Sequence, residues 1–356
     1  MHSAQRGRDS LKSLSNLDLL RSMAVLQVVV SHILLAMHHT MFGSIDVGWI
    51  GPAGVLIFFV HTSLVLMMSL ERHPDTESFY VRRFFRLYPL AIAAILILLV
   101  FHIPTQHGPD GGPFFQFPPY KNILANLLLM QNMLGGGSIL AVMWTLPLEI
   151  DMYILLPLLY FFVRRDYALW PIMLLWCVTV LYVRTSIVVR TDNNNYFLVF
   201  VPCFLSGVIC YILFRRVKPR LPAFLMPTWV ILLLGAFVFR PSYIKGWWLT
   251  IALGISLPLF RSIRSKWLVA GSKYVARYSY GIYLAHPFCI VIGVNLMQHY
   301  NIALRMAAIL VSLAVIVVPA YHYLEKPMID FGARLGDRIE ARNNLLRESL
   351  LVAEEA

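Results

Sequence analysis

Residues 17–33, LDLLRSMAVLQVVVSHI, place an arginine and a histidine in a run that is otherwise almost wholly apolar. Arg21 and His32 are eleven residues apart, close to three helical turns, so on a helix they share one face about 16 Å apart. Asp18 precedes Arg21 by three residues and can pair with it. Ionisable groups inside an apolar span are costly and mark functional sites. His32 has the chemistry of a general base; a structural core histidine and a snorkelling arginine are the alternatives.

A second cluster is basic and lies in residues 79–90, FYVRRFFRLYPL. Arg83 and Arg86 are one helical turn apart, with Arg82 beside them. One guanidinium group can donate two parallel hydrogen bonds to two oxygens of a phosphate. A basic loop at the cytoplasmic edge of a membrane has the same composition. The pattern therefore indicates either a phosphate site or an orienting loop.

Two carboxylates form the third cluster, in residues 143–157, MWTLPLEIDMYILLP. Glu149 and Asp151 stand well inside an apolar run, and Tyr153 follows Glu149 by four residues. An unpaired carboxylate at such a depth is neutralised or moved to water. The sequence therefore predicts a basic partner or a polar cavity beside these carboxylates.

The fourth cluster is YSYGIYLAHPF, residues 278–288, which carries Ser279, Tyr283 and His286 as one helical stripe. Pro287 is expected to weaken the helix just after the histidine. A structural Tyr–His hydrogen bond is the simpler alternative. Because the four clusters come from four different apolar runs, together they predict a polar pocket inside a helical bundle.

Other kinds of site find no support in the sequence. No spacing fits a metal site, no glycine loop carries the lysine of a phosphate loop, and no serine elbow occurs. The glycines of LGGGSI, residues 134–139, indicate a flexible turn. The four cysteines all lie in apolar runs and are expected to be small core residues. We therefore expect neither a metal nor a permanently bound cofactor.

The composition requires a membrane. A hydrophobic fraction of 59% and a charged fraction of 13% are too apolar for a soluble chain of 356 residues. Apolar runs of roughly 17–25 residues recur along the whole length, each long enough to cross the hydrocarbon. The predicted fold is all-α, a polytopic integral membrane bundle of about ten spans. These are residues 18–38, 48–70, 87–103, 144–163, 168–189, 196–214, 223–239, 243–260, 278–297 and 303–324.

The positions of Lys and Arg orient these spans. If residues 122–134, NILANLLLMQNML, form only a short re-entrant or interfacial helix, all but six of the 30 Lys and Arg fall on one side. The positive-inside rule makes that side cytoplasmic and places both termini there. The net charge of +12 then reflects orientation and contact with anionic lipids, and we expect no nucleic-acid binding.

The chain divides into a transmembrane domain, residues 1–332, and a cytoplasmic amphipathic C-terminal tail, residues 333–356. The first apolar run keeps its charges and lacks a small-residue cleavage site, so it is expected to be a first span and not a signal peptide. Residues near one face of the tail are Leu335, Ile339, Leu346 and Leu350, which is typical of surface packing.

The same motifs resemble the membrane-bound acyltransferase-3 family, in the right order and over nearly the whole chain. One signature of the family is an arginine and a histidine separated by ten residues, and Arg21 and His32 match it. A second is Arg-x-x-Arg followed by a proline, which Arg83, Arg86 and Pro89 match. The third motif is matched by Trp144, Thr145, Leu146, Glu149 and Tyr153. SYGIYLAHP, residues 279–287, and YLEKP, residues 323–327, match the late motifs. No single motif is decisive, but five in register are strong.

The chain departs from the family after GVLIFF, residues 54–59. The family usually has Ser-Gly there, whereas this chain has Thr62 and Ser63 preceded by His61, and Leu56 stands where many members carry an acid. These differences concern the shape of the pocket and the acceptor. Some members also carry a soluble C-terminal esterase-like domain; none follows here, so we expect transfer to be completed in the membrane domain or by a partner.

The resemblance implies acyl transfer, most simply of acetyl, from cytoplasmic acyl-coenzyme A (acyl-CoA) to a hydroxyl of a saccharide or other envelope or secreted acceptor. The implied location is a bacterial inner membrane, crossed many times. Arg21, Arg83 and Arg86 would bind the donor, with His32 and Glu149 as the catalytic residues: His32 as the base and Glu149 orienting it. The remaining pocket residues are expected to be Asp18, Trp144, Tyr153, Ser279, Tyr283 and His286. A covalent acyl-histidine is an open alternative.

A transporter is the rival from another class. In a proton-coupled transporter or flippase, His32, Glu149 and His286 would form a relay. The sequence shows no clear duplicated halves and no matched pair of broken helices, which such proteins often have. A structural or sensor protein would leave the arginine–histidine spacing a coincidence. Dependence on acyl-CoA, as opposed to a proton gradient, separates the first two functions.

Overall fold

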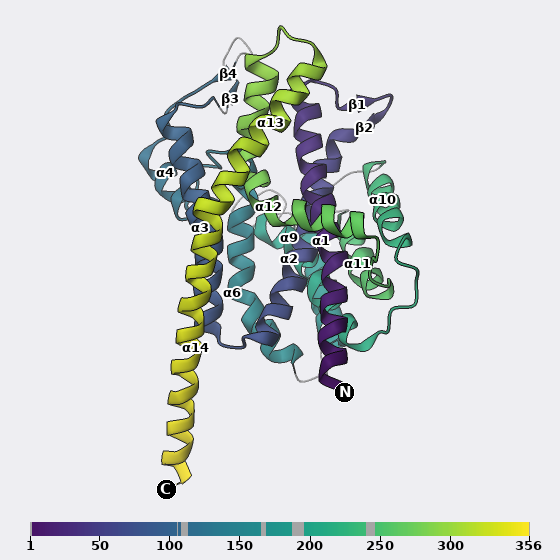
Figure 1. Ribbon diagram of the computed structural model, residues 1–356, viewed down its shortest axis with the longest axis vertical. Helices are drawn as coiled ribbons and strands as arrows, with labels where there is room; N and C mark the ends of the chain where they lie inside the picture. The colour runs from purple at the N-terminus through teal and green to yellow at the C-terminus, as the bar shows by residue number, and fades with distance from the viewer. Residues whose placement is uncertain are drawn as a thin grey trace.

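A computed structural model describes residues 2–104, 106–107, 113–164, 169–186, 196–239 and 246–355. These residues form a bundle of helices (Figure 1), which confirms the predicted all-α class. The strands described form two short antiparallel ribbons. In the ribbons β1 (Met41–Phe42) pairs with β2 (Ile45–Asp46), and β3 (Gln106–His107) with β4 (Pro113–Phe114).

Seven helices among the described residues are long and apolar enough to cross a membrane. They comprise α1 (His2–Ala36), α2 (Ile50–Arg72), α3 (Thr76–Val100), α6 (Thr145–Val163), α9 (Tyr196–Arg216), α12 (Lys266–Ile290) and α13 (Ile302–Ala320) with its continuation α14 (Lys326–Glu355). Single helical turns precede α2 and α6, at Val47–Trp49 and Ala141–Trp144. The chain therefore has the helices of a multi-pass membrane protein.

Three of the ten predicted spans fall on shorter apolar helices. α7 (Leu169–Thr185) has 17 residues, α10 (Leu225–Val238) has 14, and α11 (Gly246–Ser256) has 11 and continues as a 3-10 turn over Leu257–Leu259. At about 1.5 Å per residue, a helix the length of α10 reaches only about 21 Å of the roughly 30 Å of hydrocarbon. Residues 168, 187–189 and 243–245 of the predicted spans lie outside the described part of the chain.

Residues 122–134 form no spanning helix. They are divided between α4 (Tyr120–Leu127) and α5 (Gln131–Leu134). Leu129, between the two, has a φ of 54°, a left-handed conformation that ends α4. The prediction that this apolar piece is too short to cross agrees with these bounds.

Two helices begin earlier than their apolar runs predict. α3 starts at Thr76, although the span was expected from residue 87, and α12 starts at Lys266, although it was expected from 278. Asp75 caps α3 by accepting a 2.8 Å hydrogen bond from the backbone N–H of Ser78. Because Lys and Arg are good helix formers, the basic segments expected as loops are instead the first turns of both helices.

Pro287 does not end α12, although the sequence predicts a weak point there. The helix keeps α geometry to Ile290 and continues as a π-helix over Val291–Leu296. Proline is tolerated in membrane helices where other groups satisfy the carbonyl that it frees. The change of geometry therefore comes about one turn after the proline.

Close contacts between backbones hold the centre of the bundle together. A Cβ on Gly207 of α9 would meet the carbonyl oxygen of Val60 on α2, and one on Gly54 of α2 would meet the carbonyl oxygen of Ala24 on α1. Small residues let membrane helices approach in this way. These contacts fix α1 against α2, and with it the face that carries Arg21.

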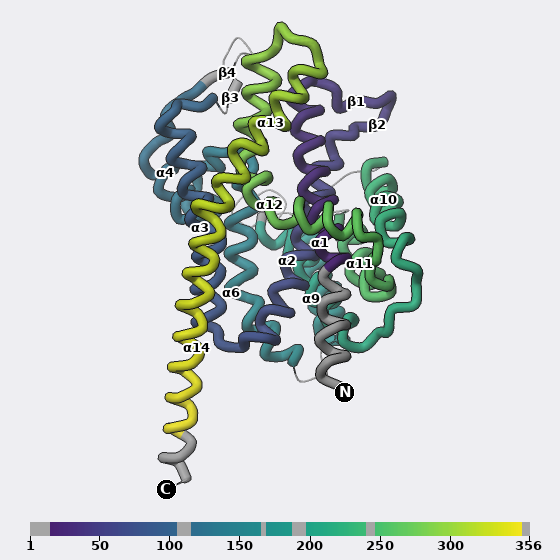
Figure 2. The backbone as a smooth tube through the Cα atoms, in the orientation of Figure 1, coloured from purple at the N-terminus to yellow at the C-terminus, as the bar shows by residue number. Residues whose placement is uncertain are grey.

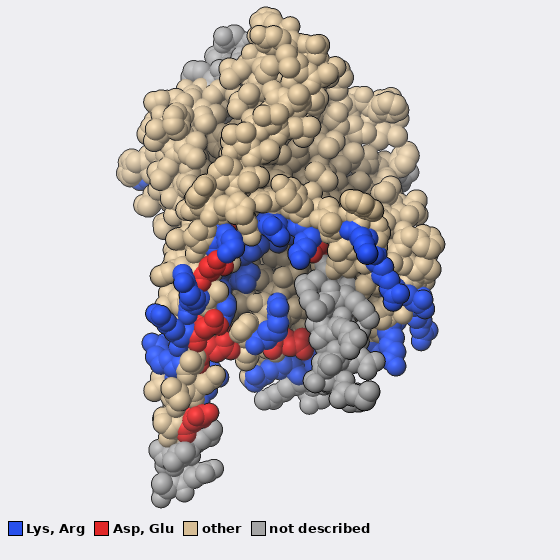
Figure 3. Space-filling model, in the orientation of Figure 1, with Lys and Arg blue, Asp and Glu red and all other residues tan. Residues whose placement is uncertain are grey.

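Charged side chains lie mainly in one half of the molecule. On the face drawn in Figure 3, Lys and Arg gather in the lower half and surround a hollow, whereas the upper half is almost free of charge. A membrane protein with one basic, cytoplasmic end has this distribution. The hollow therefore opens in the half that the sequence assigns to the cytoplasm.

The C-terminal segment is helical and lies along α3 (Figures 1 and 2). The predicted domain boundary at 332/333 falls inside α14, which runs without a break across it. Arg342 contacts Glu77 at 3.0 Å, next to the start of α3. In the predicted apolar stripe, the first half is partly buried and the second half is exposed.

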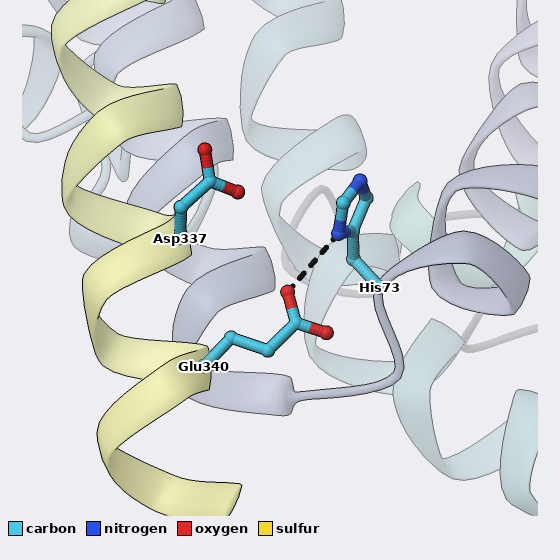
Figure 4. A group of neighbouring side chains, drawn as sticks. All are labelled: His73, Asp337 and Glu340. Atoms are coloured by element: carbon cyan, nitrogen blue, oxygen red, sulfur yellow. Dashed lines mark hydrogen bonds and ion pairs between the residues drawn. The ribbon is translucent and has the colours of Figure 1, made fainter.

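Figure 4 shows the ion-pair group between α14 and the start of α3. His73 Nδ1 lies 3.0 Å from Glu340 Oε2. His73, Asp337 and Glu340 bring three potential metal-ligand atoms within 4.8 Å of one another. Arg82, however, contacts the two carboxylates at 2.6 and 3.8 Å and already supplies a positive charge. We therefore interpret the group as the network that holds α14 on α3.

Candidate functional site

A cavity of about 250 Å³ lies among α1, α2, α3, α6 and α12. It reaches Arg72, the last residue of α2. The predicted site residues that line it are Arg21, Arg83, Arg86, Glu149, Tyr153, Ser279 and Tyr283. The predicted polar pocket therefore exists. The second, third and fourth sequence clusters each supply two of these side chains, and the first cluster supplies Arg21.

Three arginines form one wall of this cavity, which we call the arginine wall: Arg21 from α1, and Arg83 and Arg86 from α3. Arg83 and Arg86 share one face of α3 because they are three residues apart on a helix. Arg21 Nε donates to the Ser279 hydroxyl at 2.5 Å. Within the described residues, Arg83 Nε is buried and has no hydrogen-bond partner, and none of the three arginines forms a direct ion pair.

Glu149 faces the arginine wall. The Tyr153 hydroxyl donates to Glu149 Oε2 at 3.0 Å, as their spacing of one turn allows. All three arginines lie close enough to attract the carboxylate electrostatically. The predicted basic partner of Glu149 is therefore supplied by α1 and α3 together.

His32 does not line this cavity; it pairs with His286 outside it. His286 Nε2 and His32 Nδ1 are 2.9 Å apart, and the two rings stack with centroids 5.0 Å apart. Glu149 was expected to orient His32, but in the described residues its hydrogen bond goes to Tyr153. The immediate partner of His32 is thus a second histidine.

The backbone around Pro287 fixes the tautomers of this histidine pair. His286 Nδ1 lies 3.1 Å from the Ile282 carbonyl oxygen, and its ring also bonds the backbone of Tyr283, whose carbonyl Pro287 leaves without its helical donor. Carbonyl oxygens only accept, so His286 Nδ1 carries a proton and Nε2 of the neutral ring must accept. His32 Nδ1–H is then the donor to His286, and the His32 ring also bonds the backbone of Val28. In this tautomer the lone pair of the His32 ring is on Nε2.

Tyr283 stands between the cavity and the histidine pair. Its hydroxyl donates to the Val142 carbonyl at 2.5 Å and lies 2.8 Å from Thr145 Oγ1, which must then be the donor. The Tyr283 ring meets Phe58 edge-on and lies 6.1 Å from the His286 ring, centroid to centroid. The hydrogen bond between Tyr283 and His286 therefore uses the Tyr283 backbone, while the Tyr283 hydroxyl bonds Val142 and Thr145.

Three other polar or aromatic residues from the sequence clusters lie outside the cavity lining. Asp18 is partly buried within electrostatic range of Arg21, but the Arg21 guanidinium is bonded to Ser279. Trp144 packs against Phe200 with ring centroids 5.5 Å apart. Asp151, also partly buried, does not line the cavity either.

Sequence reasoning gave no role to two buried groups beside the arginine wall. His61 is 5% exposed and lines the cavity; its only signal was the departure from the family pattern. Glu325 is 3% exposed, sits in the π-turn Tyr321–Glu325 after α13, and lies within electrostatic range of Arg86 and Arg21. The sequence indicated this residue only as the glutamate of the YLEKP motif.

Comparison with known proteins identifies the family. The family model described as an acyltransferase domain matches residues 14–323. Acyltransferase MdmB of Streptomyces mycarofaciens is 29% identical over 133 residues, which are 36% of this chain and 32% of that protein. Nodulation protein 10 of Rhizobium leguminosarum bv. viciae is 27% identical over 168 residues, 42% of this chain and 45% of that protein.

The chain thus spans less than half the length of these curated relatives. No solved structure matches it. The family match covers most of the chain and takes in the arginine wall, Glu149 and both histidines of the pair. On this evidence the protein belongs to the acyltransferase-3 family.

Proposed function

We propose that this protein transfers an acyl group, most simply acetyl, from acyl-CoA on the cytoplasmic side to a hydroxyl of a saccharide-like acceptor. The observation that carries the proposal is the arginine wall: three cations line a cavity in the charged half of a membrane bundle, and within the part of the chain that the structure describes none of them contacts a carboxylate directly. The adenosine end of acyl-CoA carries several phosphates, which guanidinium groups bind in pairs. The membrane is proposed to be a bacterial inner membrane.

The donor lies along α1 in this proposal. Arg21, Arg83 and Arg86 bind its phosphates at the cavity mouth, and its pantetheine arm runs toward Tyr283. Arg21 and His32 stand on one face of α1, about 16 Å apart along the helix axis. An extended thioester arm covers that distance, so the thioester carbonyl reaches the neighbourhood of the histidine pair past the Tyr283 ring.

His32 is the general base. Its Nε2 takes the proton of the acceptor hydroxyl as the hydroxyl oxygen attacks the thioester carbonyl. The carbon–sulfur bond then breaks, and the protonated His32 returns the proton to the departing CoA thiolate. His286 Nε2 accepts from His32 Nδ1–H throughout, which holds the ring in the productive tautomer and stabilises its charged form. An acyl-histidine on the same Nε2 is the covalent variant of this step.

Glu149 acts on the donor site, not on the base. Three half-buried cations on one wall repel one another, and a facing carboxylate reduces that cost. Tyr153 holds the carboxylate toward the arginines by its 3.0 Å hydrogen bond. Loss of Glu149 is therefore expected to disturb donor binding as well as stability.

Binding of acetyl-CoA to the purified protein in detergent tests the proposal. A ligand specific for the folded state raises its thermal stability, so wild type and His32→Ala are expected to be stabilised, whereas Arg21→Ala and Arg83→Ala lose the effect. Arg164→Ala, an exposed arginine outside the cavity, is the matched control. Absence of stabilisation at millimolar acetyl-CoA would remove the donor assignment and favour the proton-coupled transporter.

A further inference from the structure

A second, smaller cavity of about 170 Å³ lies between α4 and the glycine turn that precedes α6. Gln116, Asn122 and Ser138 supply its polar groups, beside Phe117, two prolines and the backbone of Gly136. α4 lies in the upper half of Figure 1, which is the half almost free of Lys and Arg in Figure 3. This cavity, here called the amide pocket, is therefore at the opposite end of the bundle from the arginine wall.

A buried asparagine builds the amide pocket in advance of any ligand. Asn126 is fully buried and donates to the carbonyl oxygen of Gly137 at 3.0 Å and to Asn122 Oδ1 at 2.9 Å. It also accepts from the backbone N–H of Ile139 at 3.0 Å. Two of these hydrogen bonds, to Gly137 and from Ile139, fasten the glycine turn to α4, and the third orders the Asn122 side chain on α4 itself. The pocket wall is therefore positioned before any ligand binds.

Gly136 brings the turn into contact with the pocket wall. Its φ is 110°, which favours glycine, and a Cβ at this position would lie 2.6 Å from Asn122 Oδ1. No other residue type would let the backbone approach the asparagine side chain so closely. The turn predicted from LGGGSI is therefore a wall of a binding site as well as a connection.

The lining chemistry suits a neutral ring that carries hydroxyl groups. Amide side chains both donate and accept hydrogen bonds, as hydroxyl groups do, and Phe117 is 60% exposed, so its ring face is available for packing. Among the described residues that line the pocket there is no Lys, Arg, Asp or Glu, a lining that suits a neutral ligand better than phosphate or a metal. Its volume is below the roughly 300–1,000 Å³ of sites for drug-sized molecules, so it fits one sugar ring and not an oligomer.

Hydrogen bonds and neighbouring residues lead from the amide pocket toward the histidine pair. Gln131 is buried and its Nε2 bridges Ser138 Oγ, at 3.3 Å, and the carbonyl oxygen of Met143, at 3.1 Å. The residue before Met143 is Val142, whose carbonyl accepts from Tyr283, the neighbour of His286. Ile139, in the pocket wall, and Val142 are three residues apart, so their Cα atoms are at most about 11 Å apart.

We propose that the amide pocket binds one neutral sugar ring of the acyl acceptor, on the side of the histidine pair away from the donor. The inference rests on the proposed acyltransferase function, since it names where that reaction's acceptor is held. Gln116, Asn122 and Ser138 bind the ring hydroxyls, Phe117 packs on its apolar face, and Asn126 positions the turn. The acceptor and the donor then approach His32 from opposite ends of the bundle.

Saturation-transfer NMR with the full chain in detergent tests this site. The probes are methyl glycosides of glucose, galactose and N-acetylglucosamine, at millimolar concentration. At least one should receive saturation from wild type, and its signal should fall at least tenfold in Gln116→Ala and Phe117→Ala. Lys121→Ala is the matched control, since it is exposed on the same α4 and does not line the pocket; it should keep the signal.

Acetyl-CoA stabilisation of each variant reports on folding and on the donor site separately. The inference is supported if the sugar signal is lost while acetyl-CoA stabilisation stays. It is overturned if the sugar signal persists in both pocket variants, or if no glycoside binds a wild type that does bind acetyl-CoA. If acetyl-CoA itself fails to bind wild type, the proposed function is what fails.

Discussion

Removal of His286 should damage the chemical step and leave donor binding intact. His286 is 0% exposed and accepts a 2.9 Å hydrogen bond from His32, so His286→Ala takes away the group that fixes the tautomer and stabilises the charged form of the base. A hydrogen bond to a charged group contributes about 1.5–3 kcal/mol. At about 1.36 kcal/mol per factor of ten, kcat should fall about tenfold to 150-fold.

The assay is acetyl transfer under saturating donor, with the KM for acetyl-CoA measured alongside. A residue that only supports the fold would change stability and KM together, whereas a positioning role changes kcat alone. His286→Gln should recover part of the rate, because a glutamine oxygen near the old Nε2 position can still accept from His32. In His32→Ala, a further His286→Ala change should cost little, because the two act as a unit.

Two results would refute this reasoning. One is an unchanged kcat in His286→Ala, which would show that the partner of His32 is unimportant for transfer. The other is a loss in His286→Gln as large as that in His286→Ala, because the contact would then not act through hydrogen-bond acceptance.

Three further changes have expected outcomes. Arg83→Lys keeps the charge but loses the paired donors of the guanidinium, so the KM for acetyl-CoA should rise at least tenfold in steady-state assays. Tyr283→Phe removes the hydroxyl that donates to the Val142 carbonyl. The free energy of unfolding, measured by chemical or thermal denaturation, should fall by about 1–3 kcal/mol. The pKa of Asp75 is lowered: burial raises it, but hydrogen bonds from the Asn343 side chain and the backbone and nearby arginines outweigh burial. The ionised Asp75 therefore stabilises the folded state fully above the unfolded pKa of 3.8, and this stabilisation is lost as the pH falls through the lower pKa of the folded state. Amide hydrogen exchange in α14 should quicken in that acid range.

Each of these has a clear opposing result. An unchanged KM in Arg83→Lys would mean that a point charge suffices and that paired phosphate binding is not used. A Tyr283→Phe protein as stable as wild type would show that the Val142 carbonyl finds another partner. Exchange in α14 that responds to acid equally in Asp75→Asn would place the titrating group elsewhere.

Much of the fold follows from hydropathy, but the ends of its helices do not. Apolar runs locate each of the seven helices that are long and apolar enough to cross a membrane, because the hydrocarbon requires an apolar surface of that length. The starts of α3 and α12 were missed by about three turns because their first turns are basic and amphipathic, and only a cap such as Asp75 marks them. The predicted spans 223–239 and 243–260 fall on the shorter helices α10 and α11, because apolar composition does not report how long a helix is.

The site was predictable within each helix and less so between helices. Periodicity put Arg83 with Arg86 and Tyr153 with Glu149, and the structure keeps both pairs together on the cavity wall. Periodicity does not indicate which helix packs against the His32 face of α1. Glu149 was therefore expected beside His32, whereas the structure places His286 there. His61 carried no signal of its own because α2 is apolar on all sides, and a periodicity argument needs a polar face.

The central claim is that the arginine wall delivers an acyl donor to His32, and it is tested most directly by label transfer. Membranes that contain the protein would receive acetyl-CoA labelled in the acetyl group on the cytoplasmic side, and label in saccharide material would be measured. The account predicts labelling by wild type, none by His32→Ala although it binds acetyl-CoA, and little by Arg83→Ala. Equal labelling by His32→Ala and wild type would contradict it.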